Sequence, residues 1–438
     1  MVSEATFAGR RITVAGLGRF GGGIAVTRWL CAQGAKVLVT DLDSAENLGD
    51  SLEQLRGLPV EFRLGEHRER DFAEADLVVA SPAIPLQNKY LDAARAAGKV
   101  VTTEIRLFIE RCPAKIVGVT GTKGKSTATA MLGKMLESAG KTWVGGNIGK
   151  SLLFELENIR PADFVVLELS SYMLEYLRDM QWSPHVALVT MISSDHLAWH
   201  GSHEAYVDAK RNIIRFQKPD DFAVLNEDDP KCAAFALETV GKTILYGLKG
   251  RKKFELLIPG IHNQSNAQGA LAAAAIFGVD FTAAQAALAN FPGLPHRLQR
   301  VHESGGITFY NDSIATIPDA AVAALESFPA KKVIQIVGGY GKDMPITALC
   351  AALNNRAKAV LCIGSTGPSI ADLLEQPPNQ NAVATYRCGD LATAITIARQ
   401  IAASGDIILL SPGFKSYDQF VNFEKRGEEF IRLTRQNS

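Results

Sequence analysis

The chain has 438 residues, which exceeds one ordinary hydrophobic core and indicates two or three domains. Basic and acidic residues both number 46, which argues against a broad basic surface for nucleic acid or anionic lipid. No apolar run reaches the ~18 residues of a membrane span, and no signal-peptide core is visible, so we expect a cytoplasmic protein with no membrane partner. The six cysteines form no C-x-x-C pair, which predicts reduced thiols and no zinc site.

The first stretch has the pattern of a nucleotide-binding domain. We predict a strand at Arg11–Ala15, a glycine-rich turn over residues 16–21, a helix at Ile24–Gln33 and a strand at Lys36–Thr40. Asp41 then follows the last glycine of the turn by 20 positions, as in the dinucleotide fingerprint. Alone, this pattern favours an NAD-dependent dehydrogenase, and the alternative is a similar turn that binds another nucleotide or nothing.

The second pattern is a phosphate-binding loop. An apolar strand, Ile116–Val119, leads into glycines and then a helix predicted at Ala128–Ala139. A strict phosphate-loop motif would have glycine where Val119 stands, but Gly-Lys-Ser after a strand still favours phosphate binding over a plain turn with a solvated lysine. Lys125 adds positive charge to the loop N–H groups, and the Ser126 hydroxyl is suited to a phosphate-bound Mg²⁺.

Polar residues follow two further predicted strands. The run at 164–167 ends at Glu168, and the run at 186–191 leads to Asp195 and His196. The carboxyl ends of strands in an open α/β sheet meet at one edge, so Glu168 and His196 are expected near the phosphate loop and could hold Mg²⁺. The alternatives are a surface carboxylate and a structural histidine. Lys210, in a helix-like run at 203–216, is predicted from its surroundings to be an ordinary solvated lysine.

Turn residues divide the chain into three α/β regions. Breaks at residues 112–115 and 292–297 predict domains at 1–112, 113–297 and 298–438. We expect Rossmann-like first and third domains and a central phosphate-loop domain with a mostly parallel sheet.

The phosphate loop, Gly121-Thr122-Lys123-Gly124-Lys125-Ser126-Thr127, resembles that of the Mur ligases, in which asparagine usually stands at the position of Lys123. Further motifs of this family occur in the same order along the chain: Gly145–Gly149, Glu168–Ser171, Asp195–Leu197, His200–Ser202, Pro295–Arg297, Asn311–Ser313, Leu410–Pro412, Asn422–Glu424 and Arg426–Gly427.

The resemblance implies an ATP-dependent amide ligase of peptidoglycan precursor synthesis in a bacterial cytoplasm. We expect a monomer, because nothing in the sequence requires more than one chain. The first domain would bind the uridine diphosphate of UDP-N-acetylmuramoyl-L-alanine, the second ATP and two Mg²⁺ ions, and the third glutamate. The substrate carboxylate would be phosphorylated by ATP to an acyl phosphate, which the glutamate amine then attacks. D-glutamate is expected, and L-glutamate is the alternative.

The resemblance also implies roles for individual residues. Those for binding ATP are Gly121, Thr122, Lys123, Gly124, Lys125, Ser126, Thr127, Asn263, Asn266, Arg297 and Asp312. Those for catalysis are Lys125, Asn147, His196 and Lys210, and those for the metal are Ser126, Glu168, His196 and Lys210, the last as a carbamylated lysine. Those for UDP are Gly18, Arg19, Phe20 and Asp41, and those for glutamate are Thr316, Lys342, Ser416 and Phe423.

Two departures from the family pattern concern the substrates. Ile314 and Pro318 change the loop expected beside the glutamate, which bears on its stereochemistry. Phe20 and Asp43 stand where a hydroxyl or a basic residue usually faces the UDP, and an inward-pointing Asp43 would repel the diphosphate.

Overall fold

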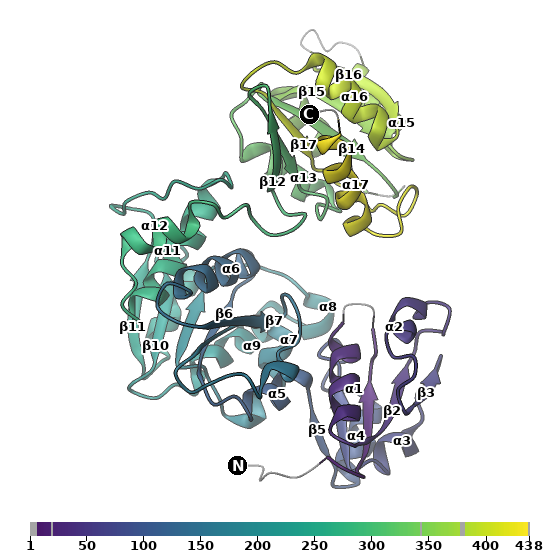
Figure 1. Cartoon of the computed structure of the whole chain (residues 1–438), viewed down its shortest axis with the longest axis vertical. Coiled ribbons are helices and arrows are strands. Elements are labelled where there is room, and N and C mark those ends of the chain that lie inside the picture. The colour runs from purple at the N-terminus through teal and green to yellow at the C-terminus, as the bar shows by residue number, and fades with distance from the viewer. Residues whose placement is uncertain (1–6, 19–20, 342–343, 377–381, 437–438) are drawn as a thin grey trace. The chain divides into compact units, whose positions relative to one another are not determined.

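A computed structural model describes residues 7–18, 21–341, 344–376 and 382–436 (Figure 1). The chain forms two compact units, which are described separately. The first consists of residues 1–252 and 265–287, and the second of residues 253–264 and 288–438.

The first unit begins with a parallel sheet. Its strands are β1 (Arg11–Ala15), β2 (Lys36–Asp41), β3 (Val60–Leu64), β4 (Leu77–Ala80) and β5 (Val100–Thr102), in the order β3-β2-β1-β4-β5. This is the order of a Rossmann-like sheet, in which ligands bind at the carboxyl ends of β1 and β4, where the strand order reverses. The predicted strands at 11–15 and 36–40 are confirmed, and β2 extends to Asp41.

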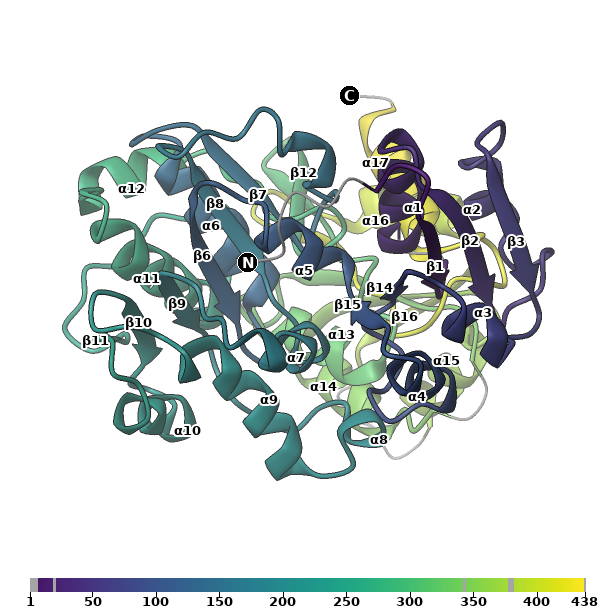
Figure 2. The ribbon, with the colours of Figure 1, turned by 90° about the horizontal axis from the view of Figure 1, so that it is seen from below.

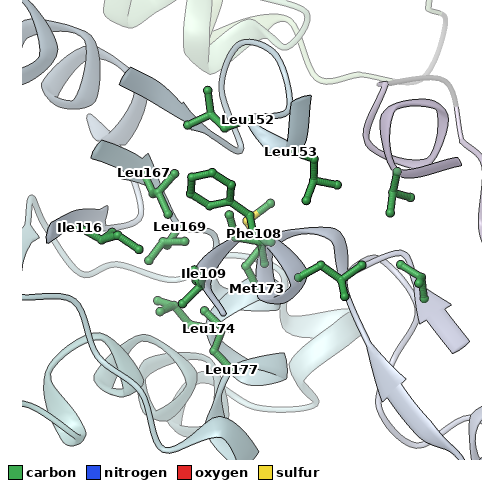
Figure 3. Packing of buried hydrophobic residues seen from close by; sticks show 14 of the residues in the cluster. Phe108, Ile109, Ile116, Leu152, Leu153, Leu167, Leu169, Met173, Leu174 and Leu177 are labelled. Carbon is green, nitrogen blue, oxygen red and sulfur yellow. The ribbon is translucent and has the colours of Figure 1, made fainter. Parts of the chain in front are cut away.

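The helices of this part are α1 (Gly22–Ala32), α2 (Gly49–Glu53), α3 (Glu69–Ala73), α4 (Lys89–Ala96) and α5 (Glu104–Ile109). Helix α5 connects this part to the following sheet. Its Phe108 and Ile109 lie among Leu152, Leu167 and Leu174 (Figure 3). One hydrophobic cluster therefore runs across the predicted boundary at residue 112, so these two sheets share one unit.

The second sheet contains the phosphate loop. Its strands are all parallel and lie in the order β11-β10-β9-β6-β8-β7. They are β6 (Lys115–Thr120), β7 (Thr142–Gly146), β8 (Phe164–Glu168), β9 (Val186–Val189), β10 (Phe222–Asn226) and β11 (Lys242–Tyr246). Strand β6 lies between β8 and β9, so the loop after β6 is flanked by the residues that follow those two strands.

The helices around this sheet are α6 (Lys125–Leu136), α7 (Ser171–Tyr176), α8 (Leu197–His200), α9 (His203–Arg215), α10 (Pro230–Ala233), α11 (Ile261–Ala275) and α12 (Phe281–Leu288), with 3-10 helices at Leu153–Glu155, Arg178–Met180 and Ala234–Leu237. Helix α6 packs against β6, β7 and β8 (Figure 2). The prediction that this helix begins at Ala128 was wrong by one turn. The left-handed conformation of Gly124, with φ at 84°, turns the chain so that Lys125 already starts the helix.

The second unit is built on a mixed sheet in the order β12-β13-β17-β14-β15-β16, in which only the pair β12–β13 is antiparallel among the described strands. The strands are β12 (Gln299–Ser304), β13 (Ile307–Asn311), β14 (Val333–Gly338), β15 (Ala357–Ile363), β16 (Ala384–Gly389) and β17 (Ile407–Leu410). The helices are α13 (Pro318–Glu326), α14 (Thr347–Arg356), α15 (Gly367–Glu375), α16 (Leu391–Ile401) and α17 (Phe423–Arg435).

Strand β14 shows why helices cover both faces of this sheet. Val333 and Val337 belong to one hydrophobic cluster, whereas Ile334 and Ile336 belong to another. Alternate residues of a strand point to opposite faces, so both faces are buried. The fold is α/β, as predicted, and each sheet lies within one predicted domain, although no observation tests the exact domain limits. In the described part of the chain, no helix is both long and apolar enough to span a membrane.

Candidate active site

The phosphate loop requires glycine at two positions. Gly121 has φ at 149° and Gly124 has φ at 84°. A Cβ atom on Gly121 would lie 2.0 Å from Thr190 Oγ1, and one on Gly124 would lie 2.3 Å from Asn266 Oδ1. The loop therefore passes too close to its neighbours for any other side chain.

Thr122 anchors the loop to the segment after β9. Its N–H donates to the carbonyl of Met191 at 2.7 Å, and its Oγ1 accepts from the N–H of Ser193 at 2.9 Å. The same Oγ1 lies 2.9 Å from the hydroxyl of Tyr206. Tyr206 was missed as a site residue, although it falls in a stretch shared with the Mur ligase pattern. The hydroxyl and the backbone N–H of Thr122 thus both serve to hold the loop.

Thr190 holds the other side of the loop and was also missed. Its hydroxyl donates to the carbonyl of Lys123 at 2.6 Å, and its own carbonyl accepts from Asn226 Nδ2 at 2.8 Å. The Lys123 side chain, which stands where asparagine is usual, is exposed, and the bond to Thr190 uses its backbone carbonyl. These bonds prearrange the loop without the help of a ligand.

Lys125, Ser126 and Thr127 form the first turn of α6. Lys125 Nζ donates to the carbonyl of Thr122 at 3.0 Å, so its ammonium group lies against the loop. The N–H groups of the first helical turn carry partial positive charge that attracts anions. A phosphate at this helix terminus would meet both the helix dipole and the lysine charge.

Glu168 ends β8 and pairs with Val119 of β6 in the register of the sheet. The residue is 1% exposed, and its Oε1 accepts from Asn147 Nδ2 at 3.0 Å. Oε2 is buried and has no hydrogen-bond partner among the residues that the structure describes. An unpartnered buried carboxylate oxygen is costly, and a hard cation would satisfy it, so Glu168 fits the predicted Mg²⁺.

Asn147 is oriented by the same glutamate. Its backbone N–H donates to the carbonyl of Glu168 at 2.8 Å, in addition to the side-chain bond. The preceding Gly146 has φ at 90°, and a Cβ there would lie 2.3 Å from that carbonyl. Strand β7 therefore ends with Asn147 fixed at the carboxyl edge of the sheet beside Glu168.

Lys210 is buried, and the prediction of a solvated lysine was wrong. It is 1% exposed, and Nζ donates to the carbonyl of Gly121 at 2.7 Å and lies 4.8 Å from the Tyr206 ring centroid. Burial lowers the pKa of the amine well below its usual value, and the charge of Lys125 lowers it further. The helical spacing of Tyr206, Lys210 and Ile213 on the inner face of α9 was the sequence signal for this burial.

His196 immediately precedes the short helix α8, and His200 is its last residue. His196 has φ at 52°, its side chain is 46% exposed, and its ring centroid lies 4.8 Å from that of Tyr172. His200 Nε2 lies 2.9 Å from Ser171 Oγ, and burial, reinforced by the charge of Lys210, lowers its pKa to about 4. An exposed imidazole can reach a cation, so His196 is available to a metal, whereas His200 Nε2 is engaged by Ser171. Apart from the gaps in the described ranges, no cluster of three or more His, Cys, Asp or Glu side chains suited to a metal occurs.

Of the predicted UDP residues, Gly18 lies in the turn after β1 and Asp41 is the last residue of β2. Asp41 Oδ2 accepts from the N–H of Gly18 at 3.0 Å, and Oδ1 accepts from the N–H of Asp43 at 2.9 Å. Asp41 thus holds two turns in place, and the predicted contacts Arg19 and Phe20 lie outside the described residues.

A cavity of about 1000 Å³ opens beside this turn, within the first unit. Its walls come from both sheets: residues 16–18 and 21–26, residues 79–83, residues 146, 147, 149–152, 154 and 155, and residues 170, 172 and 173, among others. The cavity therefore joins the glycine-rich turn of the first sheet to Asn147 and α7 of the second, which suits an elongated ligand.

The remaining predicted ATP residues differ in their surroundings. Asn266 lies beside Gly124 in the first unit. Asn263 belongs to the second unit, where its Nδ2 donates to the carbonyl of Pro259 at 2.6 Å. Asp312 is buried and accepts from Ser411 Oγ at 2.7 Å and from the N–H of Leu298 at 3.1 Å, and burial raises its pKa to about 7. Arg297 reduces that rise by its charge.

A buried arginine connects the segments that contain three of the predicted glutamate residues. Arg426, which is 1% exposed, donates from Nε to Ser313 Oγ at 2.9 Å, from Nη2 to Ser313 O at 2.8 Å and from Nη1 to Phe414 O at 3.0 Å. Ser313 Oγ in turn donates to the carbonyl of Phe423 at 2.8 Å. Arg426 thus ties together the segments that contain Thr316, Ser416 and Phe423. Its role was not predicted, although the Arg-Gly pair was noted, and Lys342 lies outside the described residues.

Comparison with protein families assigns all three regions to one family. The Mur ligase MurD-like N-terminal domain matches residues 10–103, the Mur ligase middle domain matches residues 119–256, and the glutamate ligase domain of the Mur ligases matches residues 296–414.

Similar proteins and structures agree with this assignment. The chain is 40% identical to a UDP-N-acetylmuramoylalanine–D-glutamate ligase of Roseiflexus, over 97% of this chain and 98% of that protein. It is 36% identical to the ligase of the same name from Symbiobacterium thermophilum, over 97% of each chain. The structure of UDP-N-acetylmuramate–alanine ligase from Thermotoga maritima shares the fold, with a TM-score of 0.61 at 22% identity, over 98% of this chain and 100% of that one. The chain therefore belongs to the Mur ligase family, on its MurD-like branch.

Proposed function

We propose that this protein joins D-glutamate to UDP-N-acetylmuramoyl-L-alanine at the expense of ATP, as a step of peptidoglycan precursor synthesis. The observation that carries the proposal is the identity of 40% over nearly the whole length to a ligase named for this reaction. The fold adds a phosphate loop, a buried carboxylate suited to a cation and a large cavity, all in one unit. The dehydrogenase interpretation of the first glycine-rich turn is no longer needed, because a Mur ligase domain matches that region.

The reaction has two steps. The carboxylate of the UDP-linked substrate attacks the γ-phosphorus of ATP, which gives an acyl phosphate and ADP. The amine of glutamate then attacks the acyl carbon, phosphate leaves, and the amine loses a proton as the amide forms. Both steps depend on the alignment of anionic groups and the neutralisation of their charge rather than on a protein nucleophile.

The residues of the first unit are assigned to phosphoryl transfer. Residues 121–127 form the loop that binds the phosphates of ATP, with the N–H of Thr122 engaged by Met191, and the ammonium group of Lys125 offsets the charge of the transferred group. Asn147 positions the reacting carboxylate, and Asn266 is assigned to the nucleotide.

Mg²⁺ would be held by Ser126, Glu168, His196 and a carbamylated Lys210, at two sites. When bound, it neutralises phosphate charge and orients the phosphates for in-line transfer. The low pKa of Lys210 supports its assignment, because a neutral amine reacts with carbon dioxide and an ammonium ion does not. The carbamate formed in this way is an anion that a divalent cation binds well.

The remaining residues are assigned to the uridine diphosphate, to ATP and to glutamate. Gly18, Arg19, Phe20 and Asp41 are assigned to the uridine diphosphate; Asn263, Arg297 and Asp312 to ATP; and Thr316, Lys342, Ser416 and Phe423 to glutamate. A lysine together with hydroxyl groups suits a dicarboxylate. We further propose that the enzyme acts as a monomer in the cytoplasm.

The test is phosphate release with ATP, Mg²⁺ and UDP-N-acetylmuramoyl-L-alanine, compared between D-glutamate and L-glutamate. We expect phosphate only when the UDP-linked acceptor and D-glutamate are both present. Equal ATP turnover without either substrate would contradict a ligase. Preference for L-glutamate would instead show that Ile314 and Pro318 have changed the stereochemistry of the amino-acid site.

A further inference from the structure

Helix α8 is a single turn whose position depends on side-chain contacts. It consists of Leu197–His200, and the N–H groups of Trp199 and His200 both donate to the carbonyl of His196, at 3.1 and 3.2 Å. Gly201, with φ at 80°, ends it. One helical turn has little stability of its own, so its neighbours determine where His196 lies.

Trp199 connects this turn to the first sheet. Its Nε1 donates to the carbonyl of Ala83 at 3.0 Å. Its ring packs against the cluster of buried residues at β1 and β4 that includes Ala15, Phe72 and Ala80. Ala83, with Ser81 and Pro82, lines the large cavity, so the partner of Trp199 is part of the wall of the proposed UDP-substrate pocket.

Tyr172 provides a second connection between the cavity and α8. It lines the cavity, and its ring centroid lies 4.8 Å from that of Trp199 and 4.8 Å from that of His196. Tyr172 belongs to α7, and on the same helix Ser171 Oγ lies 2.9 Å from His200 Nε2. The turn that bears His196 is thus held against α7, whose Tyr172 is part of the cavity wall.

We propose that Trp199 is a positioning residue that makes the placement of His196, and with it metal binding, depend on the UDP-linked substrate in the cavity. The proposal rests on the proposed function, because it takes that substrate as the occupant. A ligand against Ser81–Ala83 fixes the carbonyl that receives the indole N–H, and the indole fixes the turn that presents His196. By thermodynamic linkage, the metal must then raise the affinity for the substrate through the same contact.

Tyr176 offers a matched comparison within the same interface. Its hydroxyl donates to the carbonyl of Ile84 at 2.7 Å, one residue beyond the partner of Trp199, and its ring belongs to the same buried cluster. Tyr176 lies on α7, is not part of the cavity wall and has no ring contact with His196 among those found in the described residues. Its hydrogen bond reaches the first sheet from α7 and does not involve the indole N–H of Trp199.

The test is the calorimetric Kd of UDP-N-acetylmuramoyl-L-alanine with a non-hydrolysable ATP analogue, measured with and without Mg²⁺. The ratio of the two Kd values is the coupling factor. We expect Trp199→Phe, which keeps a ring and removes the N–H, to reduce this factor at least about threefold, and Tyr176→Phe to leave it unchanged. The affinity for the ATP analogue alone reports that each variant is folded.

A double-mutant cycle with His196→Ala shows whether Trp199 acts through His196. We expect Trp199→Phe to have no further effect on the coupling factor once His196 is replaced. An unchanged factor in Trp199→Phe, an equal loss in Tyr176→Phe, or additive effects in the cycle would each overturn the role of Trp199. Absence of substrate binding by the natural protein would overturn the proposed function, and the coupling with it.

Discussion

Lys210 Nζ donates a hydrogen bond of 2.7 Å to the carbonyl oxygen of Gly121, so a buried amine of helix α9 supports the phosphate loop. The loop and the helix come from segments nearly ninety positions apart, yet this bond and the Thr122–Tyr206 contact hold them together. The bond also keeps the amine beside the groups whose charges act on it: Lys125, Asp195 and Glu168.

The first prediction concerns the modification of Lys210. Because burial lowers its pKa, the amine stays neutral at lower pH than an exposed lysine does, and it remains able to react with carbon dioxide. We expect a carbamate signal in the ¹³C NMR spectrum after exposure to ¹³C-bicarbonate. The signal and the activity should disappear together as the pH falls through the pKa of Lys210 in the folded protein, since a protonated amine does not react with carbon dioxide. Lys210→Ala should lack the signal and Lys134→Ala, an exposed lysine of α6, should retain it; a signal in Lys210→Ala would assign the carbamate elsewhere.

The second prediction concerns Lys125. Its ammonium group lies against the phosphate loop, so Lys125→Ala removes positive charge from the site of phosphoryl transfer. We expect kcat to fall by about three orders of magnitude or more, while the melting temperature changes little. Phosphate release at saturating substrates measures the effect, and Lys134→Ala on the same helix is the control. A variant with the natural rate would place phosphoryl transfer at another site.

The third prediction concerns the pH dependence of stability. The pKa of Asp312 is raised from its ordinary value of 3.8 to about 7, so the folded protein binds this proton more tightly than the unfolded chain does. Its contribution to stability is fully present below about pH 4 and is lost as the pH rises through about 7, with a size on the order of 4 kcal/mol. As the pH rises from about 4 to above about 7, the melting temperature of the natural protein should therefore fall relative to that of Asp312→Asn. Parallel curves for the two proteins would show that Asp312 does not hold its proton.

The fourth prediction concerns Arg426. A lysine at this position has no planar fork to reach Ser313 and Phe414 together, so the segments around the amino-acid site lose their common anchor. We expect Arg426→Lys to raise the KM for glutamate about tenfold or more, with a smaller change in the KM for ATP. Steady-state kinetics with each substrate varied in turn measure this difference.

The control for Arg426 lies on the same helix. Arg432 is half exposed and pairs with Glu429, so Arg432→Ala should behave as the natural protein does. An equal rise in both KM values for Arg426→Lys would instead indicate a general loss of structure in the second unit.

Patterns of residues close together in the sequence determined the fold class and the phosphate loop of this protein. Alternation of apolar strands, glycine turns and helices predicted an α/β fold, and the Gly-Lys-Ser motif predicted a phosphate loop. The polar residues after two strands predicted that Glu168 and His196 lie at one edge of the central sheet, because parallel strands place their carboxyl ends together. These features depend on residues close in sequence or on general rules of sheet topology.

The tertiary structure decided what depends on distant neighbours. Lys210 is buried because the inner face of α9 faces the loop after β6. Oε2 of Glu168 has no hydrogen-bond partner among the described residues because Asn147 binds only Oε1. Thr190 and Trp199 belong to none of the motifs, and the Arg426–Gly427 motif does not reveal what Arg426 binds, since the partners of all three residues lie in other elements. A polar side chain acquires its pKa and its function from the groups packed around it, and the folded chain alone brings those groups together.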